Sequence, residues 1–237
     1  PVEGPAVFDS SKAPNVIRFS GKDPKATSSS LDFYSMAAGK KDRHMEPFMI
    51  DVKPRTGDAP QLSGHEGEEF IYVLEGAIEH RDSLGNHAQL KPGQIQVMSA
   101  GSGVQHSEYN PSKTDRLHLI QVWIMPDRAN LKPRYAEWTP TTAQLNAPKV
   151  LIISNDGREG SAHISQDADV YRVKSPQALT VVHELAQSRG LWFQLITGDV
   201  TVGDVKLQPG DAVSSEEAGR FEFVSSGPVE ALLFDLA

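Results

Sequence analysis

The chain contains no cysteine among its 237 residues. Disulfide bonds are therefore excluded, and any bound metal ion must be held by histidine and carboxylate side chains. No apolar run approaches membrane-spanning length, and no signal-peptide pattern opens the chain. These absences predict a cytoplasmic protein that does not enter a membrane.

Positive charge is also scarce, since 23 Lys and Arg are outnumbered by 31 Asp and Glu and the formal net charge is −8. Such a chain repels phosphate backbones, so we expect no direct binding of nucleic acid. Residues 1–30 contain four prolines and end in Thr27-Ser-Ser-Ser30. This composition predicts an N-terminal arm with one short strand at Val16–Phe19, and leaves no room for a helix-turn-helix.

Turn-forming residues are plentiful, with 19 glycines and 16 prolines. They separate many short apolar stretches, which favours an all-β fold over a helical one. The longest strand candidate is Arg116–Ile124, where both faces carry apolar side chains. Such a strand is expected to be covered on both sides.

The two halves of the chain repeat each other. Ile71–Gly76 matches Phe193–Gly198 in pattern, and Leu90–Gly93 matches Leu207–Gly210, each about 120 residues further on. This repeat predicts two stacked β-barrels of the jelly-roll type. We expect an arm at 1–30, a first barrel at 31–125, a connector at 126–148 and a second barrel at 149–237.

Two segments of the first half concentrate side chains that can bind metal. One reads Ser63-Gly-His65-Glu-Gly-Glu-Glu69 and leads to Gly76, and the other contains His106-Ser-Glu108-Tyr-Asn110. Residues two apart on a strand share a face, so each segment can direct a pair of side chains into a barrel. In order and spacing the segments resemble the two motifs of the cupin superfamily.

From Tyr72 onward the chain resembles the pirin family, through Tyr72–Asn86, Met98–Pro111, Arg116–Pro126 and the ending Leu232–Leu236. Pirins are two-barrel cupins with a metal, usually iron, in the N-terminal barrel. Some open flavonols such as quercetin with dioxygen, and some are described as transcriptional co-regulators. The resemblance implies one divalent metal, Fe(II) first and Ni, Mn, Cu or Zn as alternatives, with a small aromatic substrate or ligand in the first barrel.

Residues 31–76 resemble a different group, the single-domain cupins attached to helix-turn-helix regulators. Met45–Pro54 and His65–Gly76 carry this likeness, which meets the pirin likeness at Tyr72–Gly76. A recombined or engineered chimera and a divergent natural chain both explain the junction.

The pirin pattern takes its ligands from His-x-His in the first motif and His-x-Glu in the second. Here the second pair is His106 and Glu108, whereas the first has Ser63 in place of a histidine and keeps only His65. The implied metal ligands are His65, His106 and a carboxylate, either Glu69 or Glu108. Two histidines and one carboxylate are typical of Fe(II) that activates oxygen. Glu108 is the candidate catalytic base, in which case Glu69 completes the metal set.

The other histidines are expected to be structural. His80 and His118 match pirin positions that are not ligands, and the second barrel lacks both motifs. Three hypotheses stay open: a flavonol-opening dioxygenase, a non-enzymatic metal- or ligand-binding regulatory module, and a recombined scaffold without activity. We expect a monomer or a weak dimer.

Overall fold

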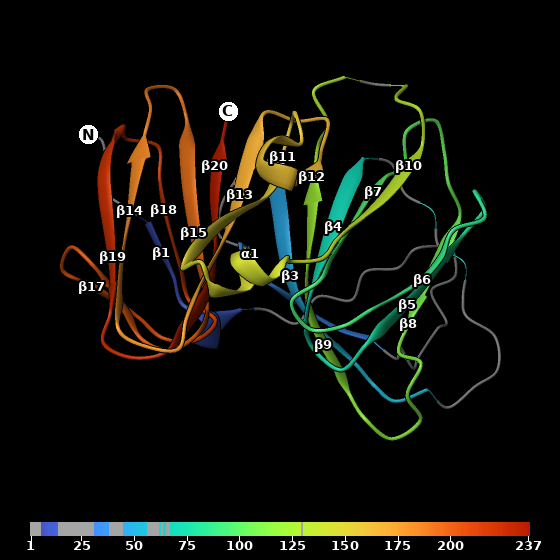
Figure 1. Cartoon of the computed structure of the whole chain (residues 1–237), viewed down its shortest axis with the longest axis horizontal. Coiled ribbons are helices and arrows are strands. Elements are labelled where there is room, and N and C mark those ends of the chain that lie inside the picture. The colour runs from blue at the N-terminus through green and yellow to red at the C-terminus, as the bar shows by residue number, and fades with distance from the viewer. Residues whose placement is uncertain are drawn as a thin grey trace. The chain divides into compact units, whose positions relative to one another are not determined.

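The computed structural model describes residues 6–13, 31–37, 45–55, 62, 64, 67–128 and 130–237. The regular secondary structure of these residues is almost entirely β-strand, as the sequence predicts (Figure 1). They belong to two compact units, residues 14–139 and residues 140–237 together with 1–13. We call these units the first and the second barrel. In the described part of the chain, no helix is long and apolar enough to cross a membrane.

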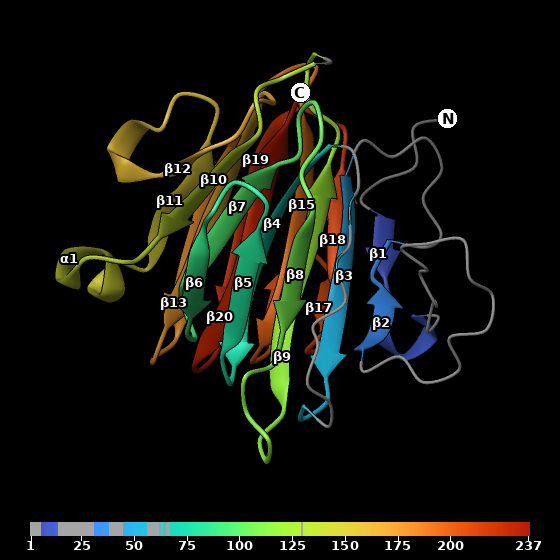
Figure 2. The same ribbon diagram turned by 90° about the vertical axis from the view of Figure 1, so that its right-hand side faces the viewer.

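The first barrel has two walls. The larger is a six-stranded sheet in the order β10-β7-β4-β9-β3-β2, and the smaller is a three-stranded sheet in the order β6-β5-β8. Figure 2 shows the smaller sheet in front of β4 and β7. The strands are β2 (Leu31–Ser35), β3 (Met45–Val52), β4 (Glu68–Glu75), β5 (Ile78–Asp82), β6 (His87–Leu90), β7 (Ile95–Ser99), β8 (His106–Tyr109), β9 (Leu117–Ile124) and β10 (Arg134–Trp138). Alternate residues of these strands, among them Phe48, Ile71 and Leu119, meet in one apolar core.

The second barrel also has two walls, a seven-stranded sheet in the order β1-β18-β15-β20-β13-β11-β12 and a four-stranded sheet in the order β14-β19-β16-β17. Its elements are β1 (Ala6–Phe8), η1 (Ser10–Lys12), α1 (Thr142–Asn146), β11 (Lys149–Ser154), η2 (Arg158–Gly160), β12 (Ala162–His163), β13 (Ala168–Ser175), β14 (Leu179–Leu185), β15 (Gly190–Thr197), β16 (Val200–Val202), β17 (Val205–Leu207), β18 (Ala212–Ser215), β19 (Gly219–Ser225) and β20 (Val229–Leu236). Phe193 and Phe223 join the two walls, with stacked rings 4.1 Å apart.

The predicted duplication is confirmed at the level of single residues. Gly76 follows β4 and Gly198 follows β15, both with positive φ. A Cβ on Gly76 would lie 2.5 Å from the carbonyl oxygen of Arg116, and a Cβ on Gly198 would lie 2.2 Å from that of Pro228. Each oxygen belongs to the residue just before β9 or β20. Gly76 thus corresponds to Gly198, and β9 corresponds residue by residue to β20.

The structure adds elements to two segments of the sequence prediction, the N-terminal arm and the connector. The arm supplies β1, which pairs antiparallel with β18, while the strand expected at Val16–Phe19 lies outside the described residues. Residues 126–148, the expected connector, contain β10, which pairs with β7, and α1. The boundaries assigned at 31, 126 and 149 stay predictions.

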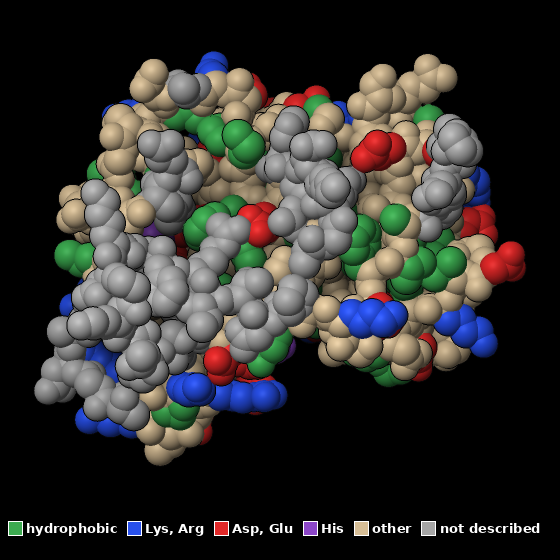
Figure 3. Space-filling view, turned by 180° about the vertical axis from the view of Figure 1, so that it is seen from behind, with side chains coloured by type: hydrophobic (Ala, Val, Ile, Leu, Met, Phe, Trp, Pro, Cys, Tyr) green, Lys and Arg blue, Asp and Glu red, His purple; other side chains and the backbone are tan. Residues whose placement is uncertain are grey.

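On the face drawn in Figure 3, acidic and basic side chains of the described residues lie beside one another.

Candidate metal centre

Three side chains of the smaller sheet of the first barrel gather in its interior. His80 lies on β5, and His106 and Glu108 lie on β8, where strand pairing places His80 directly opposite Glu108. One potential ligand atom of each residue lies within 4.8 Å of the others. His80 and His106 are buried, with rings 5.7 Å apart. Two imidazoles and a carboxylate at this separation are a donor set that fits a divalent metal ion.

Glu108 lies at the centre of this cluster. Its Oε1 atom accepts a hydrogen bond from Nε2 of Gln96 and lies 3.3 Å from Nδ1 of His80 and 3.6 Å from Nδ1 of His106. Burial alone raises the pKa of the Glu108 carboxyl, but hydrogen bonds and charge from His106 and His80 outweigh burial and hold that pKa well below its usual range. The carboxylate is therefore ionised at neutral pH, as metal binding or proton acceptance requires.

A second carboxylate, Glu69 of β4, approaches His106 from the larger sheet. Its Oε1 lies 3.8 Å from Nδ1 of His106, and its Oε2 accepts a hydrogen bond of 2.6 Å from Nε2 of Gln121 on β9. Glu69 is fully buried. Both carboxylates that the sequence offered as alternatives thus flank the same imidazole, one from each wall of the barrel.

His80 is the member of the cluster that the sequence analysis did not count as a site residue. Its Nε2 lies 3.3 Å from Oδ2 of Asp82, and its ring stacks on Tyr135 of β10 at 4.5 Å. The signal was present in the alternation of Ile78, His80 and Asp82, which share one face of β5. The missing information was the pairing register of β5 with β8.

The structure brings together Glu69, His106 and Glu108 of the predicted site residues. His65, like Ser63, lies outside the described residues. The predicted ligand set and the role of Glu108 therefore stay predictions.

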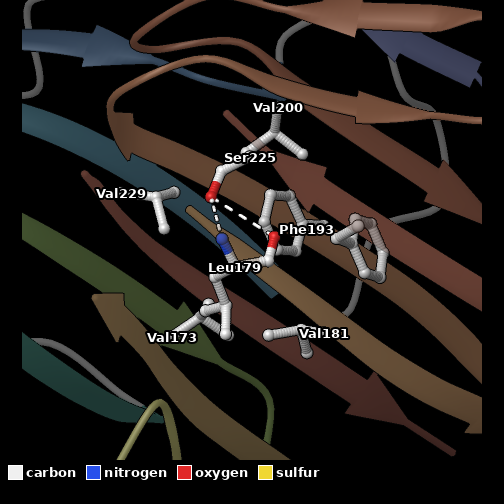
Figure 4. Close-up of a pocket in the computed structure, with 8 residues that line it drawn as sticks. Val173, Leu179, Val181, Phe193, Val200, Ser225 and Val229 are labelled. Atoms are coloured by element: carbon white, nitrogen blue, oxygen red, sulfur yellow. Dashed lines mark hydrogen bonds between the residues drawn. The ribbon is translucent and has the colours of Figure 1, made fainter. Parts of the chain in front are cut away.

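The second barrel has apolar side chains at the corresponding positions. The pairing of β5 with β8 and of β16 with β19 places Phe221 at the position of His106 and Phe223 at that of Glu108. The alignment of β4 with β15 places Leu191 at the position of Glu69. Phe223 also lines a small apolar cavity of this barrel, shown in Figure 4, where the hydroxyl group of Ser225 bonds to the backbone of Leu179.

Two jelly-roll units with the same strand order, one of them enclosing a histidine and carboxylate cluster, define a bicupin. Family models agree with this class: the Pirin model matches residues 22–124, and the model of the quercetinase C-terminal cupin domain matches residues 151–236. The quercetin 2,3-dioxygenase of Escherichia coli K12 is 41% identical over 173 residues, which cover 73% of this chain and 74% of that protein. The chain belongs to the pirin family.

Solved structures of the family have the same fold. The crystal structure of YhhW from Escherichia coli is 31% identical, with a TM-score of 0.84, and the match covers 98% of this chain and 97% of that one. The nickel(II) complex of the bacterial pirin YhhW is 30% identical, with a TM-score of 0.83 and coverage of 98% of both chains. Together with the His80, His106 and Glu108 cluster, these relatives support metal binding and do not determine which metal is bound.

Proposed function

We propose that the protein is a metal-dependent dioxygenase that opens flavonol-type substrates resembling quercetin, with its site in the first barrel. The observation that carries the proposal is buried His106 with the carboxylates of Glu69 and Glu108 on either side of it and His80 beside Glu108, in a chain whose relatives are named quercetin 2,3-dioxygenase. A ring-opening oxygenase needs a metal and a proton acceptor side by side, and this cluster contains donors for both.

The metal ligands we propose are His106 and Glu69 from the described site, completed by His65 of the first motif. Glu69 and His106 face each other from opposite walls, and both are buried, so solvent competes weakly for the ion. Two imidazoles and one carboxylate favour Fe(II), and Ni, Mn, Cu or Zn could occupy the same donors. A divalent cation bound there would acidify a substrate hydroxyl and provide the site at which dioxygen is activated.

Glu108 is then the general base. Its side chain is 15% exposed, against 2% for His106, so it can reach a substrate that enters the barrel. Gln96 and His80 hold the carboxylate in place by hydrogen bonds, which fixes the direction from which it accepts the hydroxyl proton. Because a divalent metal held by these residues would acidify a substrate hydroxyl, an ionised carboxylate with a low pKa would suffice as acceptor.

Separate Glu69→Gln and Glu108→Gln variants distinguish a ligand from a base. We expect Glu108→Gln to retain stoichiometric metal while quercetin turnover in air falls by roughly 10² to 10⁴-fold, the usual contribution of a general base. Glu69→Gln should lose metal and turnover together, because the amide is a weaker ligand than the carboxylate. Metal content is measured by mass spectrometry of the eluted ion, and turnover by loss of the flavonol absorbance.

Three results would contradict the proposal. Full turnover in Glu108→Gln would exclude that residue as the base. Stoichiometric metal without turnover of any flavonol would favour a metal-binding regulatory module, and a folded protein that takes up no metal would favour a scaffold without activity. Glu75→Gln is a matched control, since Glu75 is exposed and pairs with Arg116 on the surface.

A further inference from the structure

A lysine, a histidine and an aspartate form a hydrogen-bonded chain in the second barrel. Nζ of Lys149 on β11 lies 3.1 Å from Nδ1 of His183 on β14, and Nε2 of His183 lies 2.7 Å from Oδ2 of Asp235 on β20. His183 is buried and lies on the four-stranded wall, whereas Lys149 and Asp235 lie on the seven-stranded wall. The three side chains therefore bridge the two walls of the barrel. Arg189 donates to the other carboxylate oxygen of Asp235 and fixes its orientation.

The fold itself does not require polar residues at this place, as the first barrel demonstrates. The strand registers place Phe33 at the position of Lys149, Phe48 at that of Tyr171 and Trp123 at that of Asp235. Those three aromatic rings pack edge to face, with centroids 6.1 Å apart in each consecutive pair. Aromatic packing therefore occupies these three positions in the first barrel, whereas the second barrel carries the ionisable side chains of Lys149, Tyr171 and Asp235 there.

The tautomer of His183 follows from its partners. Because Nε2 faces the Asp235 carboxylate, it carries a proton, and Nδ1 presents its lone pair to the ammonium group of Lys149. The ammonium group also donates to the carbonyl oxygen of Val182 at 3.2 Å and lies 4.6 Å from the ring centre of Tyr171. A proton can pass from Nζ to Nδ1, and Asp235 then stabilises the imidazolium.

We propose that Lys149 is an activated amine that forms an imine with small aldehydes. A nucleophile bonded to a base, with the base oriented by a third group, is the arrangement that activates weak nucleophiles in general. Once His183 holds the ammonium proton, the free amine of Lys149 attacks the carbonyl carbon, and the carbonyl electron pair moves to oxygen. The His183 imidazolium protonates that oxygen, and the neutral imidazole then removes a proton from nitrogen, which gives the carbinolamine. The carbinolamine then loses water to give the imine, so one amine and one aldehyde yield one imine and one water.

Two further observations agree with this role. Burial lowers the pKa of Lys149, and the negative charge of Asp235 offsets that effect only in part. Lys149 nevertheless remains partly exposed. Lys149, His183 and Asp235 contribute nothing to the metal centre of the first barrel. Loss of flavonol turnover would therefore leave imine formation at Lys149 unchanged, and the reverse also holds.

The test is competitive labelling of the intact protein with benzaldehyde and cyanoborohydride at pH 7, which traps an imine as a benzylamine. Peptide mass spectrometry compares Lys149 with Lys174, an internal reference on β13 that is half-exposed and pairs with Glu230. We expect Lys149 to react several-fold faster, since a lowered pKa leaves more of its amine unprotonated at pH 7. Equal or slower labelling of Lys149 in the wild-type protein would overturn the proposal.

The His183→Gln variant tests the base. Its Lys149 should react several-fold more slowly than Lys149 of the wild-type protein, while the rate of Lys174 stays unchanged, and Glu184→Gln on the exposed face of the same strand should alter neither rate. An unchanged Lys149 rate in a folded His183→Gln variant would refute the proposed proton transfer. If His183→Gln does not fold, the wild-type pH profile decides: half-maximal labelling of Lys149 should occur at lower pH than that of Lys174, and coincident profiles would refute it.

Discussion

Replacing His106 with alanine should remove the metal from the first barrel and abolish flavonol turnover. His106 lies between Glu69 and Glu108, and both carboxylates approach the same ring nitrogen. Loss of a partner that only supports a ligand typically costs 10 to 100-fold in metal affinity, so loss of this ligand should cost more than about 100-fold. Dialysis against a competing chelator, followed by metal analysis, gives the affinity, and absorbance gives the turnover.

A matched control for His106→Ala is His87→Ala. His87 lies on the same three-stranded sheet, but its side chain is 58% exposed and pairs with Glu79. This variant should bind metal and turn over substrate as the wild-type protein does. Retention of stoichiometric metal by a folded His106→Ala variant would exclude His106 as a ligand and with it the proposed centre. Circular dichroism of both variants separates loss of metal from loss of fold.

The second large effect concerns stability. Gly198→Ala should lower the free energy of unfolding by about 3 kcal/mol or more, because the new Cβ meets the carbonyl oxygen of Pro228 in a backbone conformation with φ of +89°. Neither atom belongs to a flexible side chain, so the turn between β15 and β16 must shift. For a domain of this size the loss corresponds to a fall in melting temperature of roughly 6 to 12 °C, measured by calorimetry.

A Gly203→Ala variant measures the cost of the left-handed backbone conformation without the steric clash. Gly203 has φ of +56°, but a Cβ there would meet nothing within 4 Å. Its substitution should cost only about 1 kcal/mol, the strain of the left-handed conformation alone. Equal melting temperatures of the two variants would show that the close approach of Pro228 does not constrain the turn.

The repeat was predictable from the sequence because it depends on local features. Gly76 and Gly198 are needed where a strand turns beside a backbone oxygen, and only glycine fits there. The proximity of His106 and Glu108 was predictable for a similar reason, because residues two positions apart on a strand point to the same face of the sheet. In each case a short stretch of chain contains the whole physical constraint.

Other features depend on pairing between distant strands and could not be predicted. His80 lies beside Glu108 only because of the register between β5 and β8, which the sequence does not specify. The Lys149, His183 and Asp235 chain likewise joins three strands that are far apart in sequence. The short strand β1 was not expected at all, because three residues leave too weak a pattern to identify.

The pairing of β1 with β18 has a consequence for the order of assembly. Ser10 and Asp211, which are 201 positions apart, share a hydrogen bond beside this pair. During synthesis, residues 6–8 leave the ribosome long before their partner exists, so this edge of the second barrel stays open until β18 has emerged and β1 pairs with it. Until then β18 presents unpaired backbone groups that another chain could recruit, and a fragment beginning after residue 13 would stay in that vulnerable state.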